Sequence, residues 1–411
     1  SVFTIGKELG NEKKLNFSDN SSVDFVTINS HNGWLEVKDG VRILHLSGSN
    51  YDMGYQYGAL ASDEIQQNLR GQLSYFENHG WPYDDILEVY YQMDDNLPQK
   101  YIDEMEGMAD GSGWSFEDIA VLNTIPAIFN LQAKSCCEVS LWGPLTVNGE
   151  LYHIRGWDWT LNVKDPETGT PFHETQFIVV RKPTNDYDSM DPSFAGSIFS
   201  WGGINEKGIA IGETTCITDD STFDGISAAF RMRMVLDEAS SGGEAISIMS
   251  KDRTCGWNFV ISDGNIPEGF AIEQTASLLY VGEWDNPVED NDHYWKVNGL
   301  VRRVPYFIHP ETAKTQPNRD TDDPSGLKGF IMYLLGKNGY FGGWSFYRTI
   351  SEAVEDRAGT LDLDGTMQMI RDVYSGKTDL LFWLIQKIGF VNSVHQWVSC
   401  PKTGDFLISF A

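Results

Sequence analysis

The chain has 411 residues, of which 41% are apolar and 13% aromatic. This composition provides enough material for a large packed core, in one large domain or two ordinary ones, and is unlike that of a disordered polymer. The formal net charge of −29 argues against nucleic acid or an anionic membrane surface as a partner, because both require a basic face.

The part of the chain before residue 135 is predicted to be mainly helical. A short strand at residues 41–46 is followed by segments in which apolar residues recur with the spacing of one helix face. These segments are residues 51–77, 86–93, 98–108 and 116–129. Gly54 and Gly58 stand four positions apart in the first segment, so we expect them to permit close helix packing.

Strand patterns dominate after Cys136. Residues 139–142 and 150–155 flank Asn148-Gly149, a dipeptide typical of tight hairpin turns. Further strands are predicted at residues 175–181, 195–201, 208–213, 258–262, 269–273, 393–399 and 405–410. Helices are predicted between them at residues 228–240, 244–250, 327–335, 345–355 and 363–374.

This order of elements favours an α+β fold, in which layers of sheet are covered by helices, over an alternating parallel sheet. Residues 285–324 are rich in Asp, Asn and Pro and are predicted to form a long ordered excursion. The apolar run at residues 380–391 contains Gln386 and Lys387 and is too short to span a bilayer. The chain contains neither GKS/T nor GxGxxG, which argues against nucleotide binding.

Two of the five cysteines, Cys136 and Cys137, are neighbours. A disulfide between adjacent residues is strained, and an odd number of cysteines cannot all pair within one chain. The cysteines and the eight histidines show no CxxC or HxxxH spacing, so no metal or other cofactor is expected. Cys216, Cys255 and Cys400 are interpreted as buried core residues, and His153 and His395 as packed or surface residues.

A thiol that carries its own base is the remaining interpretation of the doublet. If the peptide bond before a cysteine is cut, the freed α-amine has a pKa near ~8 and can accept the thiol proton. Such a cysteine should begin a strand, beside a charged partner and an oxyanion donor. The predicted hairpin carries Arg155 and Asp158 back toward the doublet.

Several segments resemble the acyl-coenzyme A:6-aminopenicillanic acid acyltransferase family of N-terminal-nucleophile (Ntn) hydrolases. More distant relatives are the choloylglycine hydrolases and N-acylethanolamine acid amidases. The resemblance extends from about residue 45 to the end of the chain. It is carried by Gly54-Tyr-Gln-Tyr-Gly58, Cys136-Cys137-Glu-Val-Ser-Leu-Trp-Gly, Arg155-Gly156-Trp157-Asp158-Trp159, Gly203-Ile-Asn205-Glu-Lys-Gly208, and Asn258-Phe-Val-Ile-Ser-Asp263 followed by Phe270-Ala-Ile-Glu273.

The resemblance implies an αββα sandwich that cuts itself before the nucleophilic cysteine. Residues 1–135 would then be a mainly helical propeptide or alpha chain, and residues 136–411 the catalytic core, together in one compact unit. Carried over by position, Cys136 is the nucleophile, Arg155 lies beside the thiol, Asp158 holds the new α-amine and Asn258 stabilises the oxyanion. The interval of 22 residues from Cys136 to Asp158 suits this register; Cys137 remains the alternative nucleophile.

The implied activity is that of an amidohydrolase or acyltransferase that acts on a small-molecule acyl amide or thioester through an acyl-cysteine. Two positions depart from the family. Gly156 stands where the family usually has Asn, and Ser135 precedes the nucleophile.

Two other functions are kept as alternatives. The acidic composition and the 13 tryptophans would suit a glycoside-active protein with a carboxylate pair. Gly156 would suit a binding protein that retains an inert Ntn scaffold. Association into homo-oligomers, export with a removed signal peptide and a cytoplasmic location are all compatible with the sequence.

Overall fold

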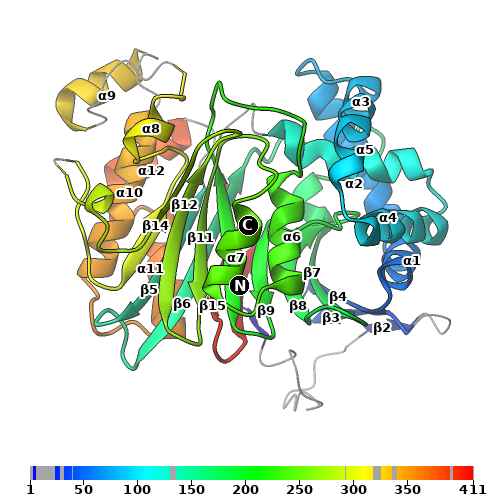
Figure 1. Cartoon of the computed structure of the whole chain (residues 1–411), viewed down its shortest axis with the longest axis horizontal. Coiled ribbons are helices and arrows are strands. Elements are labelled where there is room, and N and C mark those ends of the chain that lie inside the picture. The colour runs from blue at the N-terminus through cyan, green and yellow to red at the C-terminus, as the bar shows by residue number, and fades with distance from the viewer. Residues whose placement is uncertain are drawn as a thin grey trace.

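The computed structural model describes residues 3–5, 24–27, 32–38, 40–129, 136–291, 293–317, 325–335, 340–388 and 392–410. Within these residues two β-sheets face each other across a shared apolar layer, and helices pack on their outer faces (Figure 1). The prediction of an α+β protein built from stacked sheets covered by helices is confirmed.

The smaller sheet carries the cysteine hairpin at its centre. Its described strands are antiparallel, in the order β1 (Phe3–Ile5), β16 (Asp405–Phe410), β15 (Asn392–Cys400), β6 (Gly149–Trp159), β5 (Cys137–Gly143) and β14 (Leu300–Arg303). The β5–β6 pair is the predicted hairpin, and its register places Cys137 opposite Gly156. Gly149 begins β6 with φ of 74°, a conformation that favours glycine.

The larger sheet runs through β13 (Leu279–Gly282), β12 (Glu268–Gln274), β11 (Trp257–Asp263), β10 (Ile209–Thr215), β9 (Gly202–Asn205), β8 (Ser189–Phe194), β7 (Gln176–Pro183), β4 (Val41–Gly48), β3 (Trp34–Lys38) and β2 (Asp24–Thr27). Only β4 and β7 pair in parallel among its described strands. The N-terminal segment therefore supplies strands to both sheets, in addition to its helices.

Helices form the two outer layers. The larger sheet is covered by α1 (Asn50–Leu60), α2 (Ser62–Glu77), α3 (Tyr83–Met93), α4 (Gln99–Ser112), α5 (Phe116–Phe129), α6 (Ala228–Glu238) and α7 (Gly242–Met249). The smaller sheet is covered by α10 (Tyr340–Glu355), α11 (Leu363–Tyr374) and α12 (Leu380–Ile388). Two further helices, α8 (Pro310–Ala313) and α9 (Gly326–Leu334), and short 3-10 turns at Asp94–Asn96, Phe172–Thr175 and Pro287–Glu289 complete the described elements.

Two predicted elements were wrong in detail. The helix expected over residues 51–77 is divided at Ala61, whose backbone leaves helical geometry. The strand expected at residues 195–201 is a loop, because Gly196 turns the chain with φ of 83°. The strand lies before it, in β8, where Asp191 and Pro192 had concealed the strand pattern.

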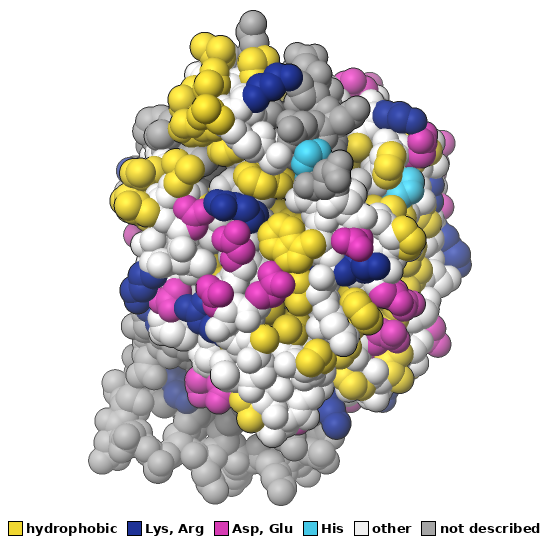
Figure 2. All heavy atoms as spheres, turned by 90° about the vertical axis from the view of Figure 1, so that its left-hand side faces the viewer, with side chains coloured by type: hydrophobic (Ala, Val, Ile, Leu, Met, Phe, Trp, Pro, Cys, Tyr) yellow, Lys and Arg dark blue, Asp and Glu magenta, His cyan; other side chains and the backbone are white. Residues whose placement is uncertain are grey.

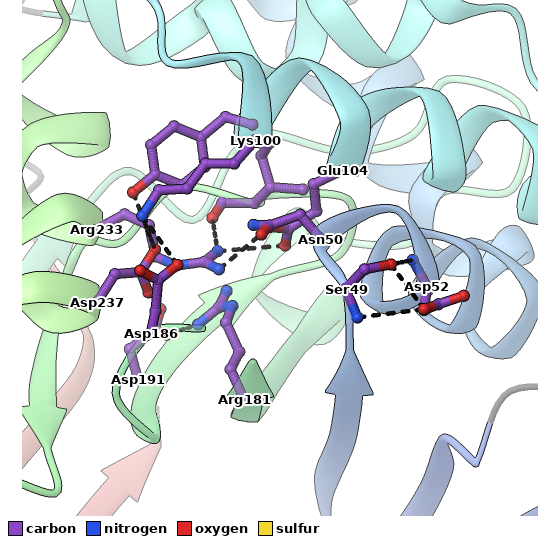
Figure 3. Close-up of polar contacts among 12 residues, drawn as sticks. Ser49, Asn50, Asp52, Lys100, Glu104, Arg181, Asp186, Asp191, Arg233 and Asp237 are labelled. Carbon is purple, nitrogen blue, oxygen red and sulfur yellow. Dashed lines mark hydrogen bonds and ion pairs between the residues drawn. The ribbon is translucent and has the colours of Figure 1, made fainter. Parts of the chain in front are cut away.

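Buried ion pairs attach the N-terminal helices to the rest of the fold. Glu104 of α4 pairs with Arg233 of α6, at 3.1 Å between Oε2 and Nη2, and Arg233 Nε lies 2.8 Å from Asp237 Oδ1. Asn50 of α1 donates to Glu104 at 2.8 Å, and Lys100 lies 3.4 Å from Asp237 (Figure 3). Because Glu104, Arg233 and Asp237 are fully buried, loss of one partner would leave an uncompensated charge in the interior.

Exposed apolar side chains gather over the C-terminal helices. Figure 2 shows hydrophobic side chains at the top of the face where α9 lies. They include Leu327, Ile331 and Leu334 of α9, and α12 exposes Leu380, Leu381 and Leu384. In the described part of the chain, every helix falls short of the length and apolarity needed to cross a bilayer.

The contact between α1 and α4 depends on glycine, as predicted. A Cβ atom added to Gly54 would lie 1.9 Å from the Glu104 carbonyl oxygen, and one added to Gly58 would lie 2.3 Å from the Met108 carbonyl oxygen. Gly107 and Gly111 of α4 approach the α1 backbone in the same way. The two helix backbones are therefore in direct contact.

We expect Gly54→Ala to destabilise the protein by about 1–3 kcal/mol, because the new methyl group must push two helix backbones apart. Gly243→Ala is the matched control, since nothing lies within 4 Å of its added Cβ and it stands inside α7. That control should stabilise the protein by up to about 1 kcal/mol. Urea unfolding of both variants measures the difference, and equal free energies of unfolding would contradict the close contact.

Candidate active site

The cysteine doublet points its two thiols to opposite sides of the smaller sheet. Cys137 begins β5 and packs with Val139 and Leu141 in the apolar layer under α10–α12. Extension of the hairpin register by one residue places Cys136 opposite Trp157, and successive side chains of a strand alternate between faces. The thiol of Cys136 therefore shares the face of Trp157, and that of Cys137 shares the face of Gly156.

Cys136 is buried close to the end of β6. Its Sγ lies 3.8 Å from the carbonyl oxygen of Asp158, and only 6% of the residue is exposed. Burial raises the pKa of the thiol to about 12; Arg155 opposes this rise, whereas the carboxylates of Glu213 and Asp158 add to it. This thiol is therefore protonated at neutral pH.

Asp158 and Cys137 both contact Tyr374, a residue that was not predicted to belong to the site. Tyr374, the last residue of α11, donates its hydroxyl to Asp158 Oδ2 at 2.9 Å and lies 3.6 Å from Cys137 Sγ. Burial raises the pKa of Asp158 to about 7, and the hydrogen bond from Tyr374 limits the rise. The thiol of Cys137 is fully buried, and its pKa lies well above the usual range.

Arg155 lies at the centre of a buried ion-pair network. Its Nε is 2.8 Å from Glu138 Oε1 on β5, it pairs through Nη2 with Glu213 on β10, and its Nη1 donates to the Gly156 carbonyl oxygen at 2.9 Å. Glu138 also lies 3.1 Å from His153 Nε2. The network joins the two sheets, because β5 and β6 belong to one and β10 to the other.

The carboxyl groups of this network ionise less readily than exposed carboxyl groups. Burial raises the pKa of Glu213 to about 7 and that of Glu138 well above its usual value, with Arg155 opposing both shifts. Burial tends to lower the pKa of Arg155, but the two glutamates raise it overall. Arg155 is therefore always charged, and its positive charge favours the Cys136 thiolate whereas the neighbouring carboxylates oppose it.

Asn258 occupies β11, on the larger sheet. Its Nδ2 donates to the carbonyl oxygens of Val304 and Tyr306, each at 2.9 Å, and the side chain is fully buried. Both N–H groups of this amide are thus engaged with the segment that follows β14. The four predicted residues do not share a single face: Cys136 and Arg155 lie together, Asp158 contacts Tyr374, and Asn258 contacts the loop after β14.

The other three cysteines are packed in the interior, as predicted, and so are His153 and His395. All five cysteines are buried thiols, and each lies in the described chain. His153 stacks on Trp397, and His395 Nδ1 lies 2.8 Å from Gln176 Oε1. Burial lowers the pKa of both histidines to about 3, so they are neutral. Among the described residues no group of three or more His, Cys, Asp or Glu side chains could hold a metal ion.

An aromatic cavity adjoins the site through Trp157. It is bordered by Asn68, Gln72, Leu122, Ile125, Trp157, Trp159, Phe172, Phe194, Ser197, Phe199 and Trp201. Trp157 lies 5.0 Å from Phe194 and 5.9 Å from Trp201 between ring centroids. Gln72 Oε1 is buried without a hydrogen-bond partner among the described residues, so the cavity offers one acceptor within apolar walls.

Three residues of this site, Glu138, Glu213 and Tyr374, were not predicted from the sequence. Glu138 could have been found, because a strand that begins at Cys137 turns residue 138 toward the opposite face, together with Arg155. Glu213 follows the apolar residues 209–212 within β10, which is a weaker signal. Tyr374 is separated by 216 residues from Asp158 along the chain, and no local pattern marks it.

Comparison with known proteins identifies related sequences. The family model of acyl-coenzyme A:6-aminopenicillanic acid acyl-transferase matches residues 148–306, a region that contains Arg155, Asp158 and Asn258 and begins after the cysteine doublet. The predicted family resemblance is confirmed. Among individual proteins, an uncharacterized protein of Archaeoglobus fulgidus is 23% identical over 68% of this chain and 52% of its own length.

Protein dcd1B of Dictyostelium discoideum is also 23% identical, over 60% of this chain and 53% of its own length. The chain thus spans about half the length of these two relatives. Among solved structures, an N-acylethanolamine-hydrolyzing acid amidase ortholog of Caenorhabditis elegans is similar with a TM-score of 0.37 and 12% identity, over 65% of this chain and 93% of that chain. A conjugated bile acid hydrolase mutant of Clostridium perfringens gives a TM-score of 0.40 and 15% identity, over 67% and 89%.

We expect Glu213→Gln to make the Cys136 thiol more acidic. The glutamate carboxylate raises the pKa of this thiol and Arg155 lowers it, so removal of the negative charge leaves the effect of Arg155 unopposed by Glu213. The pH midpoint of iodoacetamide labelling at Cys136, followed by peptide mass mapping, should fall. Glu311→Gln, a change at an exposed residue of α8, is the control, and an unchanged midpoint in Glu213→Gln would refute the electrostatic assignment.

Proposed function

We propose that the chain is a cysteine Ntn amidohydrolase or acyltransferase whose nucleophile is Cys136. The observation that carries this proposal is the position of Cys136 at the start of the hairpin, beside Arg155 and the backbone carbonyl of Asp158, in a chain that matches the acyltransferase family. The family match supports an enzyme that handles acyl groups. The cysteine mechanism and the self-cleavage are the parts that we propose.

The nucleophile is released by cleavage of the peptide bond that precedes it. The Cys136 sulfur attacks the carbonyl carbon of Ser135, the C–N bond breaks, and the α-amine of Cys136 receives the thiol proton. Water then hydrolyses the resulting thioester, which leaves a carboxylate on Ser135 and a free thiol on Cys136. Ser135 itself lies outside the described residues.

The α-amine then acts as the base that this buried thiol needs. A thiol whose pKa is about 12 in the intact chain is a weak nucleophile at neutral pH unless a nearby group takes its proton. The amine accepts that proton, the thiolate attacks the substrate carbonyl, and the amine returns the proton to the leaving group. Water or a second amine then resolves the acyl-cysteine.

The proposed roles of the neighbouring residues follow from their charges and from the groups that they contact. Asp158 accepts a hydrogen bond from the α-amine, and Arg155 favours the thiolate through its fixed positive charge. Asn258 is the proposed oxyanion donor. It can act only when one of its N–H groups leaves the carbonyl oxygen of Val304 or Tyr306, so substrate binding must move the segment after β14.

The aromatic cavity is the proposed site of the acyl group. Its apolar walls are suited to a hydrophobic acyl chain or ring, and Gln72 provides one acceptor for a substrate hydroxyl or N–H group. Trp157 belongs both to this cavity and to the face of Cys136, which supports a direct path from the cavity to the nucleophile.

We expect Cys136→Ala to abolish both self-cleavage and acyl-enzyme formation. Intact-mass spectrometry of the purified wild-type protein should show a chain that begins at Cys136, and incubation with an activated acyl ester should add one acyl mass to that chain. Cys216→Ala, which removes a buried thiol from a different apolar cluster, should behave as the wild type. Labelling that survives in Cys136→Ala and disappears in Cys137→Ala would move the nucleophile to Cys137. An uncut, unlabelled wild-type protein would favour the inert binding protein.

We expect Leu122→Ala to change the acyl preference. Removal of this side chain enlarges the aromatic cavity, and one or two additional methylene groups should be accommodated with about a tenfold gain in relative kcat/KM. Leu97→Ala is the control, because Leu97 borders a separate cavity between α3, α5 and α6. A preference that shifts equally in both variants would contradict the assignment of this cavity.

A further inference from the structure

Tyr374 reaches the site from the layer of helices that covers the smaller sheet. It ends α11, whose buried residues Met367, Ile370 and Val373 pack on the outer face of that sheet. This packing fixes the helix end over β6, so the phenol ring is directed to the place where Cys137, Gly156 and Asp158 meet.

The hydroxyl of Tyr374 occupies the space that a side chain at position 156 would need. A Cβ atom built on Gly156 would lie 2.1 Å from the Tyr374 oxygen and 2.9 Å from Cys137 Sγ. Any residue other than glycine at this position would collide with the phenol. The absence of a side chain at Gly156 and the presence of Tyr374 are therefore two parts of one arrangement.

The contacts of this hydroxyl are those of an orienting group. It donates to Asp158 Oδ2 at 2.9 Å. The second oxygen, Oδ1, is buried and has no hydrogen-bond partner of standard geometry among the described residues, although the Ser393 hydroxyl is near enough to lower the pKa of this carboxyl. One oxygen of the carboxylate is thus fixed by Tyr374, and the other is left to accept a hydrogen bond from a further group.

We propose that Tyr374 is a positioning residue that acts through Asp158, from a distant helix and in the space that Gly156 leaves free. Its hydroxyl holds one oxygen of Asp158 so that the other oxygen faces the α-amine of Cys136. This inference rests on the proposed function, because the α-amine exists only after cleavage. It also counters the interpretation of Gly156 as a sign of an inert scaffold.

The proposal predicts a change in pH dependence when the hydroxyl is removed. Asp158 is also influenced by Arg155 on β6, Lys387 on α12 and Ser393 on β15, and it lies near both thiols. These groups stay in place in Tyr374→Phe. Loss of the donated hydrogen bond makes the carboxylate harder to ionise, so the acidic limb of the profile should move to higher pH.

The first experiment measures kcat/KM against pH for Tyr374→Phe with an activated acyl ester. We expect at least a tenfold loss at pH 6, a smaller loss at pH 8 and a melting temperature close to that of the wild type. Tyr347→Phe is the matched control, because this tyrosine of α10 lies in the same apolar cluster and its hydroxyl makes no hydrogen bond among the described residues. An unchanged acidic limb in Tyr374→Phe would overturn the proposal.

The second experiment tests the exchange of one side chain for the other. Gly156→Asn alone should lose activity at least a hundredfold, because the new side chain collides with Tyr374. The double variant Gly156→Asn with Tyr374→Leu should be at least tenfold more active than Gly156→Asn alone, because the amide can then occupy the vacated space beside Asp158. A double variant no more active than Gly156→Asn would refute the idea that Tyr374 occupies the space of a side chain at position 156.

The two proposals fail in different ways. If the proposed function is wrong, the wild-type protein itself shows no chain that begins at Cys136 and no acyl label. If only the role of Tyr374 is wrong, the wild type is cut and labelled, and Tyr374→Phe retains the wild-type pH profile.

Discussion

The buried pairing of Arg155 with Glu138 and Glu213 is the interaction on which the site depends. Arg155 is fully buried, and a charge in that environment is tolerated only when opposite charges lie beside it. Because its partners belong to different sheets, the guanidinium fixes the cysteine hairpin against the larger sheet. The same charge lies beneath Cys136, so one interaction serves both the packing of the layers and the electrostatics of the thiol.

Burial has a chemical consequence for the two thiols. Removal of water disfavours the thiolate at both Cys136 and Cys137, and the neighbouring carboxylates disfavour it further. The packed histidines are neutral and engaged elsewhere. A base generated at the backbone of Cys136 would solve this problem, since it requires no further side chain in a crowded interior.

Much of the architecture could be predicted because the responsible forces are local. Leu363–Tyr374 was found to the residue, since its apolar spacing and the Asp362 cap act within a few positions. The β5–β6 hairpin followed from alternation and an Asn-Gly turn. The strand β8 was missed because Asp191 is buried in an ion pair with Arg181, so a polar residue stood where an apolar one was expected.

The site was predictable only in part, for a related reason. Arg155 and Asp158 follow from the hairpin register, which places them near the doublet. Neither the engagement of Asn258 by the loop after β14 nor the contact of Tyr374 with Asp158 has a local signal, because each depends on packing between distant segments. Gly156 was the one indication of the contact with Tyr374, because a glycine within a buried strand leaves space that another side chain can occupy.

The N-terminal segment contributes to both sheets and is attached by the buried Glu104–Arg233 pair. A cut before Cys136 would therefore produce an obligate heterodimer whose two polypeptides were folded as one. Neither fragment could bury its strand edges or its charges alone, so the mature form would be maintained by slow unfolding and would not reassemble readily once separated. Maturation of this kind is irreversible: the molecule would fold once, before the cut.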